Sequence, residues 1–181
     1  MKAIHTTPFE GLFVIDLFHA GDERGMFVKP LHAPTLQKWG LEYDFPESFY
    51  SHNKRGVIRG MHFQYPPDDH AKIVYCSQGA LTDVVIDLRK DQPTYGKVFH
   101  IELRGDNYTA LYVPKGFAHG FCVTEDNTTM VYFTSTVHSP ENDGGVLWSS
   151  IPFEWPIEAD ERTHSARDLT FPSFNDFTSP F

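Results

Sequence analysis

The chain has 181 residues, a length that suits a single unit with a sizeable hydrophobic core, so we expect one domain spanning residues 1–181. It carries 15 lysines and arginines against 24 aspartates and glutamates, a formal net charge of -9, which argues against general binding to nucleic acid or to anionic membranes. No apolar run approaches the roughly 20 residues of a membrane span, and Asp16 comes too early for a signal peptide, so the sequence predicts a soluble cytoplasmic protein.

Short runs rich in β-branched and aromatic residues, separated by turn-forming residues, predict strands along most of the chain. One helix is predicted at Ala33–Trp39, with Pro34 at its start and Gly40 after its end. Residues 57–137 leave no room for helices between strands, which excludes a parallel α/β sheet and predicts a sandwich or barrel. From Ile151 onward we expect an irregular tail that wraps the body. The predicted strands are Gly11–Phe18, Val57–Gln64, Lys72–Ser77, Leu81–Leu88, Lys97–Leu103, Ala110–Val113, Gly120–Val123 and Met130–Val137.

Alternation within strands predicts which side chains share a face. Strict alternation would place Arg59 and His62 on opposite faces of their strand. A bulge at Gly60 would bring both to one side, and glycine inside a strand is a known mark of a bulge. Two further alternating sets are Lys72, Val74 and Cys76 in one strand, and Met130, Tyr132 and Thr134 in another.

Two histidines stand in apolar strands and raise the question of a metal site. His62 lies in VIRGMHFQ, and a lone histidine in such a strand is more often a core residue than a catalyst. His119 lies in YVPKGFAHGF, whose Pro-x-Gly-x-x-His turn occurs in cupin jelly rolls, where this histidine often binds metal. Metal cupins add a His-x-His pair and a nearby glutamate, whereas here the next glutamate after His62 is Glu102. The two histidines alone make too thin a ligand set, so no metal is predicted.

Three other side chains are weak candidates when each is taken alone. Lys72 in HAKIVYC has the pattern of an edge lysine whose ammonium reaches solvent. Tyr132 in TTMVYFTST has the pattern of a core aromatic, and Asp168 that of a turn carboxylate. Together with His62 they supply a base, an orienting carboxylate, a cation and a phenol, the groups needed to move protons next to a carbonyl. Cys76 and Cys122, set in apolar runs, are predicted to be buried free thiols.

Four strings, in order along the chain, resemble the dTDP-4-dehydrorhamnose 3,5-epimerase family of sugar-nucleotide epimerases. The resemblance runs from GDERG at residues 21–25 to Asp168 and implies an all-β cupin jelly roll with short helices, an irregular C-terminal tail, a homodimer and no metal or other cofactor. Enzymes of this family remove a proton next to the 4-keto group of a nucleotide-linked 6-deoxysugar and return it to the opposite face. The strings are RGVIRGMHFQ, HAKIVYCSQGALTDVVIDLRKDQPTYG, YVPKGFAHGF and SPENDGGVLW.

The same resemblance implies a role for each candidate. His62 matches the general base, and Asp168 matches the carboxylate that orients it. Lys72 matches the cation that holds the keto oxygen, and Tyr132 matches the acid on the other face. The chemistry fits these roles, because imidazole titrates near neutral pH and the charge that develops on the oxygen needs a preorganised cation.

Nine further positions match residues that the family uses to bind substrate, a nucleotide diphosphate sugar. Guanidinium groups suit the diphosphate because they offer paired donors, and they gather positive charge locally in an acidic chain. In the family, the GDERG segment reaches the site of the partner subunit. The positions are Arg24, Arg59, His119 and Arg167 for the sugar and diphosphate, with Phe27, Lys29, Glu47, His138 and Asp143 completing the set.

The predicted nucleotide site departs from the family pattern. Relatives that use thymidine typically carry Glu, Gln and Tyr at the positions of Lys29, Glu47 and His138, and Glu at that of Asp143. A lysine could donate to N3 or O2 of cytosine while a glutamate accepts from its amino group. We therefore hypothesise that dTDP is not the preferred carrier, with CDP the first substitute and GDP the next. The alternative is that Lys29 and Glu47 form a salt bridge and the base is held loosely.

The residues alone do not exclude three other functions. One is a metal-dependent cupin, such as a dioxygenase, and another is a catalytically inactive sugar-nucleotide-binding module. The third is 3,4-ketoisomerase chemistry on the same substrates, against which only the placement of Lys72 and Tyr132 argues. The sequence also leaves open whether C3, C5 or both are inverted.

Overall fold

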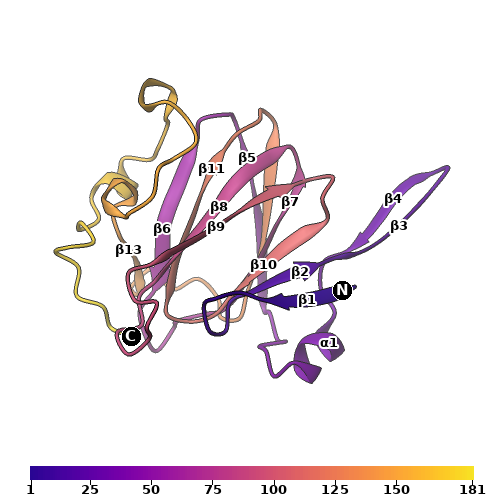
Figure 1. Cartoon of the computed structure of the whole chain (residues 1–181), viewed down its shortest axis with the longest axis horizontal. Coiled ribbons are helices and arrows are strands. Elements are labelled where there is room, and N and C mark those ends of the chain that lie inside the picture. Colours follow the sequence, from indigo (N-terminus) through magenta and orange to yellow (C-terminus); the bar gives the residue numbers. More distant parts are fainter.

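Two antiparallel β-sheets pack face to face in the computed structural model, which describes residues 1–181 (Figure 1). This agrees with the predicted all-β fold. The six-stranded sheet has the order β1 (Ala3–Thr6), β2 (Phe13–Asp16), β10 (Thr109–Val113), β7 (Lys72–Gln78), β12 (Thr128–Thr134) and β5 (Glu47–Asn53). The five-stranded sheet has the order β13 (Asp143–Gly145), β6 (Ile58–Gln64), β11 (Phe117–Val123), β8 (Ala80–Asp87) and β9 (Val98–Arg104).

The main core lies between the sheets and is formed by alternate residues of their strands. Val74 of β7 and Met130 of β12 face Leu81 of β8 and Phe121 of β11 across this core. Burial of such side chains supplies the main force that holds the two sheets together. Cys76 belongs to the same cluster and is free, as predicted.

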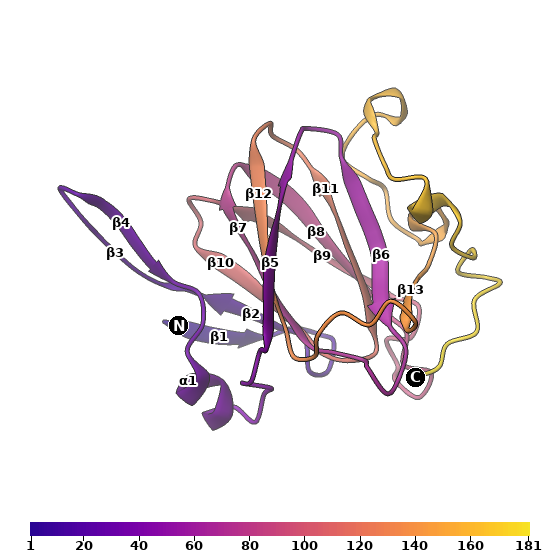
Figure 2. The same cartoon turned by 180° about the vertical axis from the view of Figure 1, so that it is seen from behind.

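The outer face of each sheet is also covered. Helix α1 (Ala33–Lys38) places Leu36 against Ile73 on the outer face of the six-stranded sheet. On the outer face of the five-stranded sheet, Trp148 and Trp155 of the C-terminal segment pack in one cluster with Ile58. Figure 2 shows this segment at the end of the molecule opposite helix α1. This segment contains the 3-10 turns η1 (Trp148–Ser150), η2 (Ala159–Glu161) and η3 (Arg167–Leu169).

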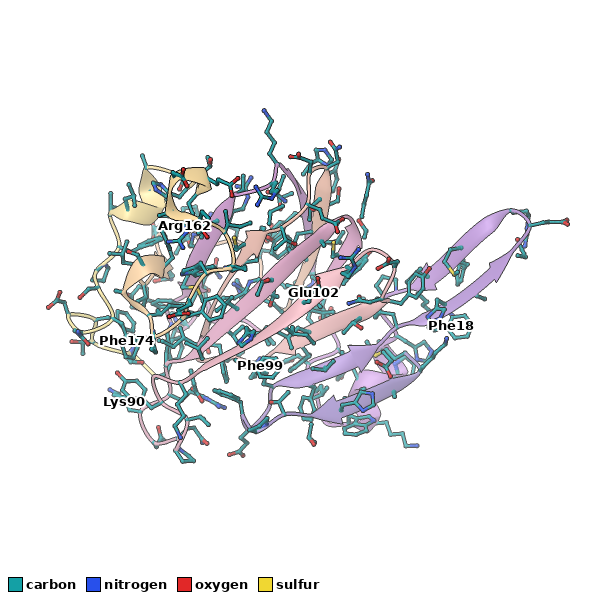
Figure 3. All side chains as sticks on the ribbon, turned by 45° about the horizontal axis from the view of Figure 1, so that its top comes forward. Phe18, Lys90, Phe99, Glu102, Arg162 and Phe174 are labelled. Atoms are coloured by element: carbon teal, nitrogen blue, oxygen red, sulfur yellow. The ribbon has the colours of Figure 1, made fainter.

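A separate hairpin of β3 (Phe18–Asp22) and β4 (Gly25–Lys29) projects away from both sheets (Figures 1 and 2). Figure 3 shows Phe18 on this hairpin, and Phe99 and Glu102 on β9 of the body. The apolar side chains Phe18, Met26 and Phe27 are exposed on the hairpin, Phe27 by 58%. Exposed aromatic residues on a projecting ribbon are typical of an interaction surface.

Most of the predicted elements are confirmed, with changes at their ends. The helix ends one residue early, because Trp39 forms its C-cap. The prediction of one strand over Gly11–Phe18 is wrong, because the chain divides at Leu17, whose N–H donates to the Tyr108 carbonyl, and Phe18 begins the hairpin. Strands β1, β4, β5 and β13 were not predicted.

The single α-helix has six residues, and no helix of the structure is long and apolar enough to span a membrane.

Candidate active site

A cavity of about 480 Å³ opens between the two sheets. Its walls are the inner faces of β5, β7 and β12 from one sheet and of β6 and β11 from the other, with contributions from the segments that follow β12 and β13. It collects nine of the thirteen predicted site residues: Glu47, Arg59, His62, Lys72, His119, Tyr132, His138, Asp143 and Arg167.

The strand registers explain why these side chains meet. His62 of β6 lies directly opposite His119 of β11, and Lys72 of β7 lies opposite Thr134 of β12. In the same way, Tyr132 of β12 is paired with Phe49 of β5. Directly opposed residues on neighbouring strands place their side chains side by side on one face of the sheet.

A bulge at Gly60 places Arg59 and His62 on the same wall, which is one of the two arrangements that the sequence left open. Between these two residues, β6 has two residues where β11 has only Gly120, so the alternation is reset. Gly60 has φ 143°, and a Cβ there would lie 2.6 Å from the Gly120 Cα. Both glycines are therefore required by the close approach of the two strands.

His62 and Asp168 form the predicted pair. His62 Nε2 lies 2.8 Å from Asp168 Oδ1, and the carboxylate comes from the η3 turn, which packs behind β6. The Gly60 N–H also donates to Asp168 Oδ2 at 3.3 Å. Burial by itself raises the pKa of Asp168, but the hydrogen bonds from His62 and Gly60 outweigh it and hold the pKa below its ordinary value. Asp168 is thus an anion that fixes the orientation of the His62 ring.

Lys72 places its ammonium close to this pair. Lys72 Nζ donates to the His62 carbonyl at 3.3 Å, which leaves two of its three N–H groups for other acceptors. Burial lowers the pKa of Lys72 to about 8, while Asp143 and Asp83 act in the opposite direction. The side chain is therefore a cation at neutral pH, in a position to meet negative charge inside the cavity.

Tyr132 stands on the sheet that faces His62. Its ring is 8% exposed and stacks on Phe49, with ring centroids 4.6 Å apart and an interplanar angle of 18°. Burial raises the pKa of the Tyr132 phenol well above its ordinary value, so the hydroxyl keeps its proton. The cavity thus has a basic nitrogen on one wall and a phenol on the other.

Two arginines, Arg59 and Arg167, add positive charge to the lining of the cavity. Arg59 Nε donates to Asn53 Oδ1 at 2.9 Å, and an Arg167 terminal nitrogen donates to Asp143 Oδ2 at 2.5 Å. Each guanidinium keeps further N–H groups that these contacts do not use. The site therefore has the paired donors that a diphosphate requires.

His119 is held by a carboxylate that the sequence analysis missed. His119 Nε2 lies 2.8 Å from Asp83 Oδ2, and both side chains are buried. Burial raises the pKa of Asp83, while His119 and Lys72 oppose the rise. Asp83 could have been found from the sequence, because it is a charged residue inside the otherwise apolar run of β8. A charged residue is rarely buried without a partner, so its position indicates a buried ion pair.

Phe49, Gln64 and His70 also line the cavity without having been predicted. Phe49 lies on the edge strand β5, whose polar sequence ESFYSHN does not have a strand-like pattern. His70 stands two residues before Lys72, a spacing that puts both on one face of an extended chain.

Arg24, Phe27 and Lys29 lie on the projecting hairpin and do not line the cavity of their own chain. Arg24 is paired with Asp22 of the same hairpin, and Lys29 Nζ lies 5.7 Å from the centre of the Phe18 ring. Lys29 and Glu47 do not pair within the chain, since Glu47 Oε2 accepts the His138 N–H at 3.0 Å. These hairpin residues need a second chain if they are to act at a cavity.

The donor set of the cavity does not fit a metal ion. The structure has no group of three or more histidine, cysteine, aspartate or glutamate side chains arranged to hold one. His62 and His119 each direct Nε2 at a carboxylate instead.

Known proteins share both this sequence pattern and this fold. The family model described as dTDP-4-dehydrorhamnose 3,5-epimerase matches residues 6–176. The epimerase of that name from Shigella flexneri is 39% identical over 141 residues, which cover 76% of this chain and 78% of the relative.

Two solved structures extend the comparison to the fold. The dTDP-6-deoxy-D-glucose-3,5-epimerase of Legionella pneumophila, in complex with dTDP-4-keto-L-rhamnose, has a TM-score of 0.92 at 28% identity and covers 97% of this chain and 94% of its own. The dTDP-4-dehydrorhamnose 3,5-epimerase of Bacillus anthracis, with TDP and PPi bound, has a TM-score of 0.90 at 34% identity, with coverages of 95% and 99%. The predicted cupin jelly roll is confirmed by this likeness. Sequence and structure together show that the chain belongs to the dTDP-4-dehydrorhamnose 3,5-epimerase family, a family of isomerases.

Proposed function

We propose that this chain, acting as one domain, inverts C3, C5 or both of a nucleotide-linked 4-keto-6-deoxysugar in deoxysugar biosynthesis. The observation that carries the proposal is the placement of the His62–Asp168 pair on one wall of the cavity, the Tyr132 phenol on the facing wall, and the Lys72 ammonium beside the pair. Inversion of a carbon requires a proton acceptor and a proton donor on opposite faces. Membership of an epimerase family supports the same chemistry.

The first half of the reaction is removal of a proton from a carbon next to the keto group. Asp168 holds His62 Nε2, so the lone pair on the other ring nitrogen takes the proton and the carboxylate stabilises the imidazolium. The electron pair of the broken C–H bond moves into the enolate, whose negative charge rests on the C4 oxygen. Lys72 meets that charge, a role for which one donor in other enzymes contributes about 2.7–4 kcal/mol.

The second half returns a proton to the opposite face of the same carbon. Tyr132 keeps its proton at neutral pH because its phenol is buried. It can therefore donate this proton once the enolate has formed beside it. Transfer of this proton gives the inverted keto sugar and a phenolate, which regains a proton from solvent. The imidazolium of His62 likewise loses its proton to solvent, so the enzyme returns to its starting state.

The diphosphate is assigned to Arg59 and Arg167, and a second chain is assigned a part in the same site. Arg24 and Phe27 belong to the hairpin of β3 and β4, which projects from the body (Figure 1), and neither residue lines the cavity of its own chain. A homodimer in which each hairpin reaches the cavity of its partner would give Arg24 a diphosphate to bind and Phe27 an apolar contact. We expect this homodimer in the cytoplasm.

The nucleotide is proposed to differ from that of the dTDP-binding relatives. Glu47 and His138 both line the cavity, the His138 N–H donates to Glu47 Oε2, and the second carboxylate oxygen of Glu47 remains an acceptor. An acceptor at this position suits the amino group of cytosine, and Lys29 from a partner chain would supply a donor. CDP is thus the first carrier to try, and GDP the next.

Comparison of kcat/KM for one sugar on dTDP, CDP and GDP tests this choice. The expected order has CDP first, and Glu47→Gln is expected to move the preference toward dTDP, because an amide can both donate to and accept from thymine. A clear preference of the unmodified protein for dTDP would refute the proposal about the nucleotide while leaving the epimerase chemistry intact.

The chemistry itself is tested by incubation with the keto sugar in D₂O. Deuterium is expected at C3, C5 or both, with inversion at the labelled carbon and no change after dialysis against a chelator. Activity lost to the chelator and restored by a divalent ion would favour a metal-dependent cupin. Migration of the carbonyl from C4 to C3 would favour a ketoisomerase, and binding without any exchange would favour an inactive binding module.

A further inference from the structure

Arg59 is an arginine of the cavity that has no acidic partner. Arg167, the other arginine of the lining, is paired with Asp143, whereas no aspartate or glutamate forms a salt bridge with Arg59. The Arg59 side chain is exposed, and its hydrogen bond runs from Nε to Asn53 Oδ1 at 2.9 Å. Both terminal nitrogens of this guanidinium are therefore open to a ligand, and its charge is not offset by a neighbouring carboxylate.

Asn53 is the residue that holds this guanidinium. It is 3% exposed and stands at the end of β5, directly opposite Thr128 of β12. Arg59 comes from β6 in the other sheet, so the bond between the two side chains connects the sheets between which the cavity opens. A buried partner on the opposite sheet restricts where the Arg59 side chain can lie.

The hydrogen bonds of Asn53 determine which end of its amide faces Arg59. The amide nitrogen donates to the Ser51 carbonyl at 3.0 Å and to the Thr128 carbonyl at 3.3 Å. A carbonyl oxygen can only accept, so Nδ2 must face these two groups and Oδ1 must face the Arg59 N–H. The amide thus fixes Nε without a negative charge, whereas a carboxylate in the same place would form an ion pair with Arg59.

We propose that Asn53 is a positioning residue for diphosphate binding, because its neutral amide directs Arg59 and leaves the charge and both terminal nitrogens for the ligand. The proposal rests on the proposed function, which assigns the diphosphate to Arg59 and Arg167. An acceptor at Nε leaves the terminal N–H groups as the paired donors that phosphate oxygens take. The two arginines then differ, since Arg167 shares its charge with Asp143 and Arg59 supplies a charge that is not shared.

The test is a double-mutant cycle on the full chain, with the affinity for inorganic pyrophosphate measured by calorimetry. Asn53→Asp keeps an acceptor for Nε but adds a negative charge, and Asn53→Ala removes the acceptor without adding a charge. Each change is made in the unmodified protein and in Arg59→Met. Asn107→Asp is the matched control, because it adds the same charge on the turn between β9 and β10, outside the cavity.

The expected result is a loss of affinity that depends on the presence of Arg59. In the unmodified protein, Asn53→Asp should weaken pyrophosphate binding about tenfold and Asn53→Ala about threefold, while Asn107→Asp leaves it unchanged. In Arg59→Met, neither change at residue 53 should alter the affinity by more than about twofold, because both act through the guanidinium. Equal losses in the two backgrounds would show a structural role and overturn the proposal, as would unchanged affinity in Asn53→Asp.

Deuterium uptake from D₂O by the 4-keto-6-deoxysugar nucleotide gives a second measurement. Asn53→Asp should raise KM and leave kcat nearly unchanged, because the diphosphate is bound but does not react. A fall in kcat with KM unchanged would overturn the role of Asn53. Absence of uptake by the unmodified protein would overturn the proposed function instead, whatever the result of the pyrophosphate cycle.

Discussion

Tyr132, His62 and Lys72 have ordinary side chains whose chemistry is set by what surrounds them. Tyr132 is closed in by Phe49 on one side, and the buried phenol keeps its proton. His62 has its ring orientation fixed by a buried carboxylate. Burial also lowers the pKa of Lys72, which lies on the same sheet as Tyr132. Burial therefore keeps the phenol protonated and narrows the pH range in which Lys72 is a cation.

Replacing Tyr132 with Phe should separate the two halves of the reaction. His62 still removes the proton, so deuterium from D₂O continues to enter the sugar, but the facing wall has no acid and the inverted product becomes scarce. Tyr50→Phe is the control, because Tyr50 lies next to Phe49 on β5 but is 71% exposed. Mass spectrometry measures label, and chromatography measures epimer. Equal yields of epimer from the variant and the unmodified protein would show that another acid is used.

The lowered pKa of Lys72 predicts an alkaline limit to activity. Lys72 is charged below about pH 8 and neutral above it, so kcat/KM should fall as the pH rises through about 8. Lys72→Arg keeps a charge at higher pH and should move this limb upward, whereas Lys72→Met should lose activity at every pH. A limb that stays in place in Lys72→Arg would assign it to another group.

At the level of single residues, the resemblance to a known family identified more of the site than the local sequence pattern around each residue did. His62, Lys72 and Tyr132 each had an ordinary structural explanation, and only their joint match to a family pattern singled them out. Asp168 illustrates the limit most clearly, because no local signal in an irregular tail shows that the η3 turn will pack behind β6. Asp83 and His70 were missed because their partners lie on other strands or loops.

At the scale of elements, the bulge in β6 controls the site. Gly60 inside a strand pattern indicated that a bulge was possible, but the sequence left open whether Arg59 and His62 share a face, and the register of β6 and β11 shows the bulge. The edge strands β1, β5 and β13 could not be predicted from the sequence, because they are short or polar and depend on their neighbours for hydrogen bonds. The division of Gly11–Phe18 was hidden for a similar reason, since both halves have the composition of one continuous strand.

Gly60→Ala should therefore damage both stability and catalysis. The new Cβ would lie 2.6 Å from the Gly120 Cα at a φ of 143°, so the strands must separate, at a cost of about 2–5 kcal/mol of unfolding free energy. Gly40→Ala is the matched control, with a positive φ of 69° but nothing within 4 Å of the added Cβ, and should cost only about 1–2 kcal/mol. Urea unfolding measures both. Equal costs would show that strand contact does not restrict residue 60.

At the scale of the molecule, the hairpin of β3 and β4 separates three predicted binding residues from the cavity of their own chain. These three residues can contribute to substrate binding only if each hairpin reaches the cavity of a second copy of the chain. Exposed Phe18, Met26 and Phe27 on the hairpin suit such a contact. The sequence could not show this placement directly, because a strand pattern does not say which chain a hairpin meets.

Mixing two inactive variants tests the shared site. Arg24→Ala damages the hairpin, and His62→Asn damages the cavity. If hairpins act on the partner, a mixed dimer has one intact site, formed by His62 of one protomer and Arg24 of the other, so activity returns after the two proteins are unfolded and refolded together. If hairpins act on their own chain, every site in the mixture is defective and no activity returns.

His62 is the base that begins the proposed reaction, so every later step depends on it. The most direct measurement is the rate of deuterium uptake at C3 and C5 of the 4-keto-6-deoxysugar, followed by NMR in D₂O for the unmodified protein, His62→Asn and Asp168→Asn. Uptake should be abolished in His62→Asn while the affinity for the nucleotide diphosphate stays nearly unchanged, and it should be reduced but still measurable in Asp168→Asn, which loses only the stabilisation of the imidazolium. Uptake at the unmodified rate in His62→Asn would contradict the assignment of His62 as the base.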